Sequence, residues 1–122
     1  MSAFADLTSL APLAIWDGVS GRVVAGERAA LVIVELDPGS LVPEHSHDNE
    51  QIGVCATGSL TFRIGDESRE LGPGDTWSIP SGAPHEVRAG PEGAVVIEAF
   101  VPARADWSRL ERLEPAEPRW PA

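Results

Sequence analysis

The chain has 122 residues, with nine basic and nineteen acidic side chains and a formal charge of −10. A chain of this length holds one compact domain, which we predict to span residues 1–122, and leaves no room for a second. All nine basic residues are arginine, and tyrosine is absent. The composition therefore excludes Schiff-base chemistry on a lysine, P-loop phosphate binding through a lysine, and a phenolic acid or base.

The acidic balance also bears on partners and location. Nucleic acids and anionic membranes are bound through clustered Lys and Arg, and the sequence has no such cluster, so neither is an expected partner. An apolar stretch starts at Leu7, but Pro12 interrupts it and no basic residue precedes it, so it is typical of neither a signal peptide nor a membrane span. The lone Cys55 excludes an intramolecular disulfide and fits a reducing compartment, so we predict a cytoplasmic protein.

Short β-branched runs between glycine- and proline-rich turns predict an all-β fold. In chain order, the expected strands cover residues 13–16, 22–25, 28–36, 51–56, 59–64, 68–71, 75–79, 85–89 and 93–101. The separators between them, such as Thr57-Gly58, are turn formers. Strands at this spacing indicate a sandwich or a small barrel.

Only the end of the chain has a helical pattern. Asp106 is placed to cap a short segment that carries Trp107, Leu110 and Leu113, and Pro115 would end it. The proline-rich residues 114–122 are expected to form a loose tail.

All three histidines fall in two short segments. His45 and His47 are two residues apart, so on an extended strand they present their imidazoles to the same side. Two neutral imidazoles form half of a transition-metal site, for which Zn, Cu, Fe and Ni are all suitable. A third ligand must come from another strand, and His85 is the one histidine left. In the alternative, one or two of these are ordinary surface or core histidines held by hydrogen bonds.

These segments resemble the two motifs of the cupins, small β-barrels of the double-stranded β-helix or jelly-roll type. The first motif is matched by Gly39, His45, His47 and Gly58. The second is matched by Gly74, Pro80, Gly82 and His85, with Ala89 in place of the family's asparagine. The resemblance implies an all-β, single-domain cupin with its barrel core at about residues 28–101 and a short C-terminal helical segment.

The glutamate of the first cupin motif falls on Gln51, beside Glu50. A neutral glutamine leaves the charge of a divalent metal uncompensated, which favours Lewis acidity and an anionic or carbonyl substrate. Because the spacing from Gln51 to Gly58 is the one the family uses, the resemblance favours a site in which a divalent Ni, Zn, Mn or Fe is held by His45, His47, Gln51 and His85. Coordination by Glu50 stays open as the opposite assignment; otherwise Glu50 is a solvated turn residue.

The last expected strand carries a carboxylate among apolar residues. By strand parity Glu98 shares a face with Val96 and Phe100, and Arg104 follows the strand. This ending resembles the KdgF-type pectin-degradation cupins, which convert unsaturated uronates released from pectin or alginate into linear keto forms. The resemblance implies that Glu98 and Arg104 are catalytic and that Phe100 and Arg104 bind substrate, although the family acid is usually Asp. In the alternative, Glu98 and Arg104 form a structural ion pair beside a core Phe100.

The expected function is therefore metal-dependent ring-opening or isomerisation, of isomerase or lyase type, on a small oxygenated acid such as an unsaturated uronate. The carboxylate would move a proton, and the arginine would clamp a substrate carboxylate. Two alternatives stay open: a dioxygenase or biosynthetic tailoring cupin, and a non-catalytic cupin that binds a sugar or metabolite. Cupins of this kind often dimerise, so a homodimer is expected. Cys55 is expected to be a small buried hydrophobe, and Trp77 a core residue.

Overall fold

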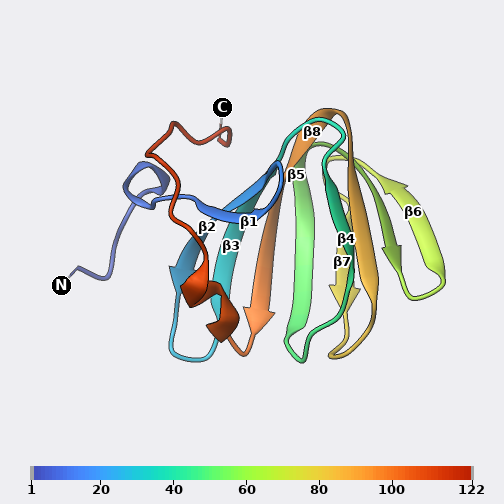
Figure 1. The fold of residues 1–122 in the computed structure, drawn as a ribbon, viewed down its shortest axis with the longest axis horizontal. Helices are drawn as coiled ribbons and strands as arrows, with labels where there is room; N and C mark the ends of the chain where they lie inside the picture. The colour runs from blue at the N-terminus through green and yellow to red at the C-terminus, as the bar shows by residue number, and fades with distance from the viewer. Residues whose placement is uncertain (1, 122) are drawn as a thin grey trace.

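A computed structural model describes residues 2–121 and shows strands folded round a common core (Figure 1). The strands are β1 (Leu13–Trp16), β2 (Val19–Ala25), β3 (Ala30–Leu36), β4 (Leu41–His45), β5 (Glu50–Ile64), β6 (Glu67–Leu71), β7 (Thr76–Ile79) and β8 (His85–Val101). They form one antiparallel sheet in the order β1-β2-β3-β8-β5-β6, with β4 paired to β8 and β7 paired to β5. The predicted all-β class is confirmed. Met1 and Ala122 lie outside the described residues.

Two short 3-10 helices, η1 (Leu7–Ser9) and η2 (Ala105–Arg109), flank the strands. The helical segment predicted near the C-terminus is η2, but its predicted cap is wrong: Arg104 holds the cap position without a side-chain cap bond. The Asp106 carboxylate instead accepts hydrogen bonds from the Arg104 guanidinium, because a charge-assisted pair is stronger than a bond to a neutral amide. Leu113 lies beyond the end of η2. Within residues 2–121, no helix is long and apolar enough to cross a membrane.

The strands β5 and β8 are much longer than the sequence predicts, because each covers two expected strands. The predicted turn at Thr57-Gly58 does not reverse the chain, because both residues are paired with β8 and lie between two register shifts of the β5–β8 ladder. Gly58 has a φ of 81°, and a Cβ there would lie 2.0 Å from the carbonyl oxygen of Gly93. Glycine is therefore required at this position because the two strands approach closely, as well as for its backbone conformation.

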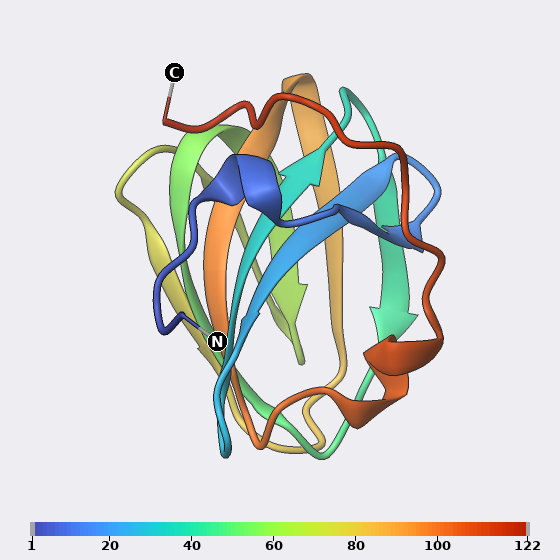
Figure 2. The same cartoon turned by 90° about the vertical axis from the view of Figure 1, so that its left-hand side faces the viewer.

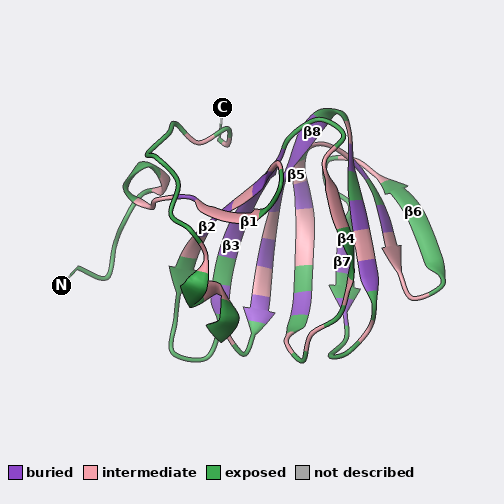
Figure 3. Ribbon diagram, in the orientation of Figure 1, coloured by how far each residue is buried: buried purple, intermediate pink, exposed green. Residues whose placement is uncertain are grey.

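Side chains alternate between the core and the outer face along the strands, as the burial colours show (Figure 3). On β8 the inward row includes Val96, Glu98 and Phe100, all of them buried. Cys55 is 1% exposed and belongs to this core, as predicted, and Trp77 is buried in it too. The barrel therefore buries one carboxylate among apolar side chains.

The outer face of β2 and β3 is bound to both ends of the chain (Figure 2). The buried Arg22 guanidinium donates to the Glu35 carboxylate at 2.9 Å and to the backbone carbonyls of Leu10 at 3.2 Å and Ala116 at 2.6 Å. The backbone N–H of Arg119 donates to the same carboxylate at 2.8 Å. The prediction of a loose tail is wrong for the described residues, because these polar groups tie it to the sheet.

Candidate functional site

The three histidines meet at one end of the barrel. His45 ends β4, His85 begins β8, and the two residues are paired across these strands. His47 lies two residues beyond the end of β4, so the expectation that it shares a strand with His45 is wrong. The loop nevertheless returns its ring to the cluster, and one ligand nitrogen from each histidine lies within 4.8 Å of the others.

Backbone carbonyls fix the tautomer of each histidine. Each Nδ1 faces a carbonyl oxygen two residues away, at 2.8 Å for His45 and 2.9 Å for both His47 and His85. A carbonyl can only accept, so Nδ1 carries the proton and donates it. The lone pair of each neutral ring is then on Nε2, which is the arrangement of metal-binding histidines oriented by a hydrogen bond from their other nitrogen.

Burial keeps two of these imidazoles uncharged. It lowers the pKa of His85 to about 4, against the opposing effect of its hydrogen bond to the Ala83 carbonyl. Burial also lowers the pKa of His47, and the positive charge of Arg104 adds to that effect. His85 is 1% exposed, and its buried Nε2 has no hydrogen-bond partner within the described part of the chain. A buried, unpartnered lone pair of this kind suits a bound cation.

Gln51 brings a second unusual contact. Its Oε1 lies 3.0 Å from Nε2 of His47, while its Nε2 donates to the Glu98 carboxylate. Two lone pairs thus face each other with no hydrogen between them, an arrangement that a cation between the two atoms would relieve. The imidazole and amide donors therefore fit a divalent transition metal. Glu50 is exposed and is the neighbour of Gln51 on β5, so it is not part of the cluster.

The carboxylate of Glu98 is buried and forms no ion pair with any residue between 2 and 121. Its Oε2 accepts hydrogen bonds from Nε2 of Gln51 and, at 2.9 Å, from the indole Nε1–H of Trp77. Burial raises its pKa, more than these two donors and the more distant Arg104 lower it. No ion pair joins Glu98 and Arg104 among residues 2–121, so the alternative of a structural pair is not observed.

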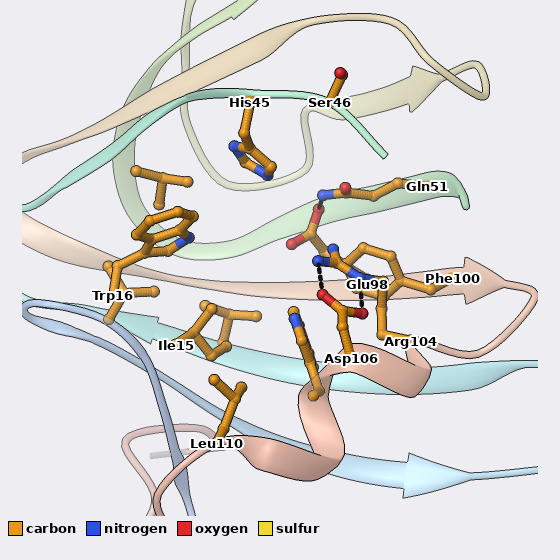
Figure 4. Close-up of a pocket in the computed structure, with 14 residues that line it drawn as sticks. Ile15, Trp16, His45, Ser46, Gln51, Glu98, Phe100, Arg104, Asp106 and Leu110 are labelled. Carbon is orange, nitrogen blue, oxygen red and sulfur yellow. Dashed lines mark hydrogen bonds and ion pairs between the residues drawn. The ribbon is translucent and has the colours of Figure 1, made fainter. Parts of the chain in front are cut away.

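The guanidinium of Arg104 is held on several sides. Its carbon lies 5.4 Å from the ring centre of Phe100 and 4.9 Å from that of Trp107. Nε and Nη2 donate to the two carboxylate oxygens of Asp106 at 3.0 and 2.8 Å, which also lowers the pKa of Asp106 (Figure 4). The guanidinium of Arg104 was expected to bind a substrate carboxylate. In this structure two of its nitrogens are bonded to the carboxylate of Asp106 instead.

A cavity of about 360 Å³ collects most of the predicted residues: His45, Gln51, Glu98, Phe100 and Arg104 all line it. His85 lines a smaller cavity of about 50 Å³, to which Gln51 and Glu98 also contribute. Sequence reasoning missed Trp16, whose ring lies 5.5 Å from His45, because no local motif marks it. It also missed the contact between Trp77 and Glu98.

Comparison with known proteins shows which family the chain resembles in sequence and fold. The chain is 32% identical over 93 residues to the pectin degradation protein KdgF of Dickeya dadantii, covering 75% of this chain and 84% of the relative. It is 34% identical over 79 residues to the oxalate decarboxylase OxdC of Bacillus subtilis, covering 61% of this chain and 20% of that longer protein. The structure of KdgF from a Halomonas species matches with a TM-score of 0.79 and 27% identity, over 87% of this chain and 98% of the other.

The structural match to KdgF extends over most of both chains, so the two share one architecture. The family model for the cupin domain matches residues 32–100, which contain all three histidines, Gln51 and Glu98. The chain therefore belongs to the cupin family, and resembles its KdgF-type members.

Proposed function

We propose that this cupin is a metal-dependent enzyme that opens the ring of a small unsaturated uronate by proton transfer. The observation that carries the proposal is Glu98, a buried carboxylate bonded by the neutral indole of Trp77, which lines the same cavity as His45, Gln51 and Arg104. The similarity to a pectin degradation protein supports the substrate class. The homodimer, the anionic substrate and the cytoplasmic location stay predictions.

In this proposal His45, His47, His85 and Gln51 hold the metal. Bound there, a divalent transition metal would supply Lewis acidity toward a hydroxyl or carbonyl oxygen of the substrate. The protein contributes neutral imidazoles with fixed tautomers, and a neutral amide in place of a carboxylate. The ligand set therefore adds no negative charge that would repel an anionic substrate.

Glu98 is the proposed proton carrier. A carboxyl whose pKa is raised by burial keeps its proton to higher pH than an exposed carboxyl does, which suits a group that both delivers and accepts a proton. Both of its hydrogen bonds fall on Oε2, and Oε1 receives none within the described chain. Figure 4 shows the second carboxylate oxygen turned away from Gln51. Oε1 is thus the atom available to a substrate.

Arg104 is the proposed anchor for the substrate carboxylate. Stacking against Phe100 and Trp107 fixes the plane of the guanidinium, which favours two parallel hydrogen bonds to a carboxylate. A substrate must either take the fork from Asp106 or use Nη1, which forms no hydrogen bond within residues 2–121. Arg104 also supplies local positive charge in a chain whose net charge is −10.

The test combines metal analysis of the purified protein with ultraviolet absorbance after unsaturated uronates are added. We expect about one divalent metal per chain and a loss of absorbance as the conjugated double bond is consumed. The variant His85→Ala should lose both the metal and the turnover. A fully loaded protein that leaves the absorbance unchanged would contradict the proposed reaction, and oxygen consumption by iron-loaded protein would favour a dioxygenase instead.

A further inference from the structure

Three neighbouring strands place Trp77, Gly53 and Glu98 in one row. Gly53 on β5 is paired in register with Trp77 on β7 and, across its other edge, with Glu98 on β8. Residues in such a row project from the same face of a sheet. Because the middle residue has no side chain, the indole of Trp77 reaches across it and donates Nε1–H to Oε2 of Glu98 at 2.9 Å.

The space that Gly53 leaves is filled by this indole. A Cβ on Gly53 would lie 2.6 Å from Nε1 of Trp77 and 2.7 Å from both Cε2 and Cζ2, closer than carbon atoms approach without displacement. The backbone of Gly53 does not have a positive φ, so a strand here accepts alanine. A methyl group at this position would therefore act on the indole, with little direct effect on the strand.

The hydrogen bond from Trp77 falls on one of the two carboxylate oxygens of Glu98. Trp77 and Gln51 both donate to Oε2, and both are neutral. The exposed fractions of Trp77 and Glu98 are 7% and 8%, so solvent has little access to the hydrogen bond between them. Phe62 packs against the indole with a ring separation of 4.9 Å and has no contact with the hydrogen bond itself among the bonds of the described residues.

We propose that Trp77, reaching across Gly53, is a positioning residue that holds Oε2 of Glu98 so that Oε1 is presented to the substrate. This inference rests on the proposed function for the role of Glu98 in proton transfer. The inference gives Trp77 a role in positioning Glu98 in addition to its packing in the core. It also explains why a strand that is otherwise well supplied with side chains has glycine at position 53.

The first test removes the donor and keeps the ring, in Trp77→Phe. We expect kcat to fall about 10- to 100-fold, the range for losing a hydrogen bond to a catalytic carboxylate, while KM and metal content stay within about twofold. Gly53→Ala should lower kcat in the same way by displacing the indole. The double variant should be no slower than the slower single variant, because both act through one hydrogen bond.

The matched control is Phe62→Leu, which removes an aromatic contact to the indole and leaves its N–H in place. It should lower the free energy of unfolding and keep kcat within about twofold of the wild type. If Trp77→Phe keeps the wild-type kcat, or if it loses metal, Trp77 does not act by positioning Glu98 and the inference is overturned.

A second readout needs no turnover and separates this inference from the proposed function. In the metal-free protein, nuclear magnetic resonance resolves the indole N–H signals of the four tryptophans, and Trp77→Phe identifies the signal of Trp77. That signal should shift more than the other three in both Glu98→Gln and Gly53→Ala. If wild-type protein turns over no uronate, the proposed function fails while this shift still supports the contact. An unshifted Trp77 signal in both variants overturns the inference.

Discussion

Two glutamates of this barrel are equally buried and have opposite surroundings. Glu35 on β3 and Glu98 on β8 are each 8% exposed. Glu35 lies on the outer face and is bonded by the guanidinium of Arg22 and the backbone of Arg119. Glu98 lies on the inner face and is bonded by the neutral N–H groups of Trp77 and Gln51. Burial therefore does not distinguish the structural carboxylate from the candidate catalytic one, whereas the charge of the partners does.

The difference follows from what each face has to do. On the outer face, the ion pair of Arg22 and Glu35 satisfies the carbonyls that come from both ends of the chain. On the inner face, a positive charge beside Glu98 would lower the pKa of its carboxyl and oppose the effect of burial. Neutral donors orient the group and leave its proton affinity raised.

The largest expected effect is on activity in Glu98→Gln. The amide keeps an acceptor oxygen for Trp77 but cannot carry the proton, so kcat should fall 10²- to 10⁴-fold. The free energy of unfolding should stay the same or rise, because a buried carboxyl is removed. Steady-state kinetics and urea unfolding on one preparation check both results, and a turnover close to that of the wild type would refute the proton-carrier role.

The converse variant, Glu35→Gln, should act on stability. It leaves the guanidinium of Arg22 buried without its counter-charge, which costs about 3 kcal/mol of unfolding free energy. Turnover per folded molecule should stay within about twofold. Urea denaturation gives the first quantity, and activity normalised to the folded fraction gives the second. If activity fell and stability did not, the assignment of the two carboxylates would be reversed.

A smaller effect is expected at the arginine that faces the cavity. Arg104→Ala removes the proposed anchor for a substrate carboxylate but no metal donor, so KM should rise about tenfold and metal content should not change. Kinetics over a range of substrate concentrations and metal analysis measure the two quantities. Loss of metal in this variant would show that Arg104 supports the histidine cluster instead.

The smallest effect is a pH dependence of the free energy of unfolding that comes from Glu98. Burial raises the pKa of Glu98 above its ordinary value of 4.5, so above that pH the folded state binds more protons than the unfolded state. The stability that the protonated group contributes is present at lower pH, and is lost as pH rises through the folded pKa. Urea unfolding of metal-free protein from pH 4 to 8 should show wild type losing stability relative to Glu98→Gln. A constant difference between the two would contradict it.

The candidate site was predictable where it depends on short spacing. His45, His47, Gln51 and His85 were predicted from their resemblance to the two cupin motifs. Alternation placed Glu98 and Phe100 on one face of a strand, and the resemblance to KdgF-type cupins marked both as site residues. The contact of Trp77 with Glu98 was not predictable, because it requires the register of three strands across Gly53. Register is set by pairing between segments far apart in sequence, and no single segment carries it.

The fold was predictable in class, but the lengths of its strands were not. Glycine-containing turns and bulges use the same residue types, so local propensity could not tell that Thr57-Gly58 continues a strand. The prediction that Asp106 caps the helix was wrong for a related reason. The guanidinium of Arg104 lies nearby and donates to the carboxylate of Asp106. In both cases a partner outside the local pattern decided the outcome.

The long β5–β8 ladder has a consequence for how the protein would acquire the proposed metal. It pairs Glu50 with Val101 at one end and Ile64 with His85 at the other, so every bond in it closes a loop of the chain. Contacts between segments far apart in sequence form slowly, because the chain loses the entropy of loop closure before the contacts contribute stability. The histidines come from segments that lie together only in the folded barrel, so the unfolded chain has no preformed metal site. Metal uptake should thus follow folding and stabilise the folded state by mass action, with an apparent melting temperature that rises with metal concentration.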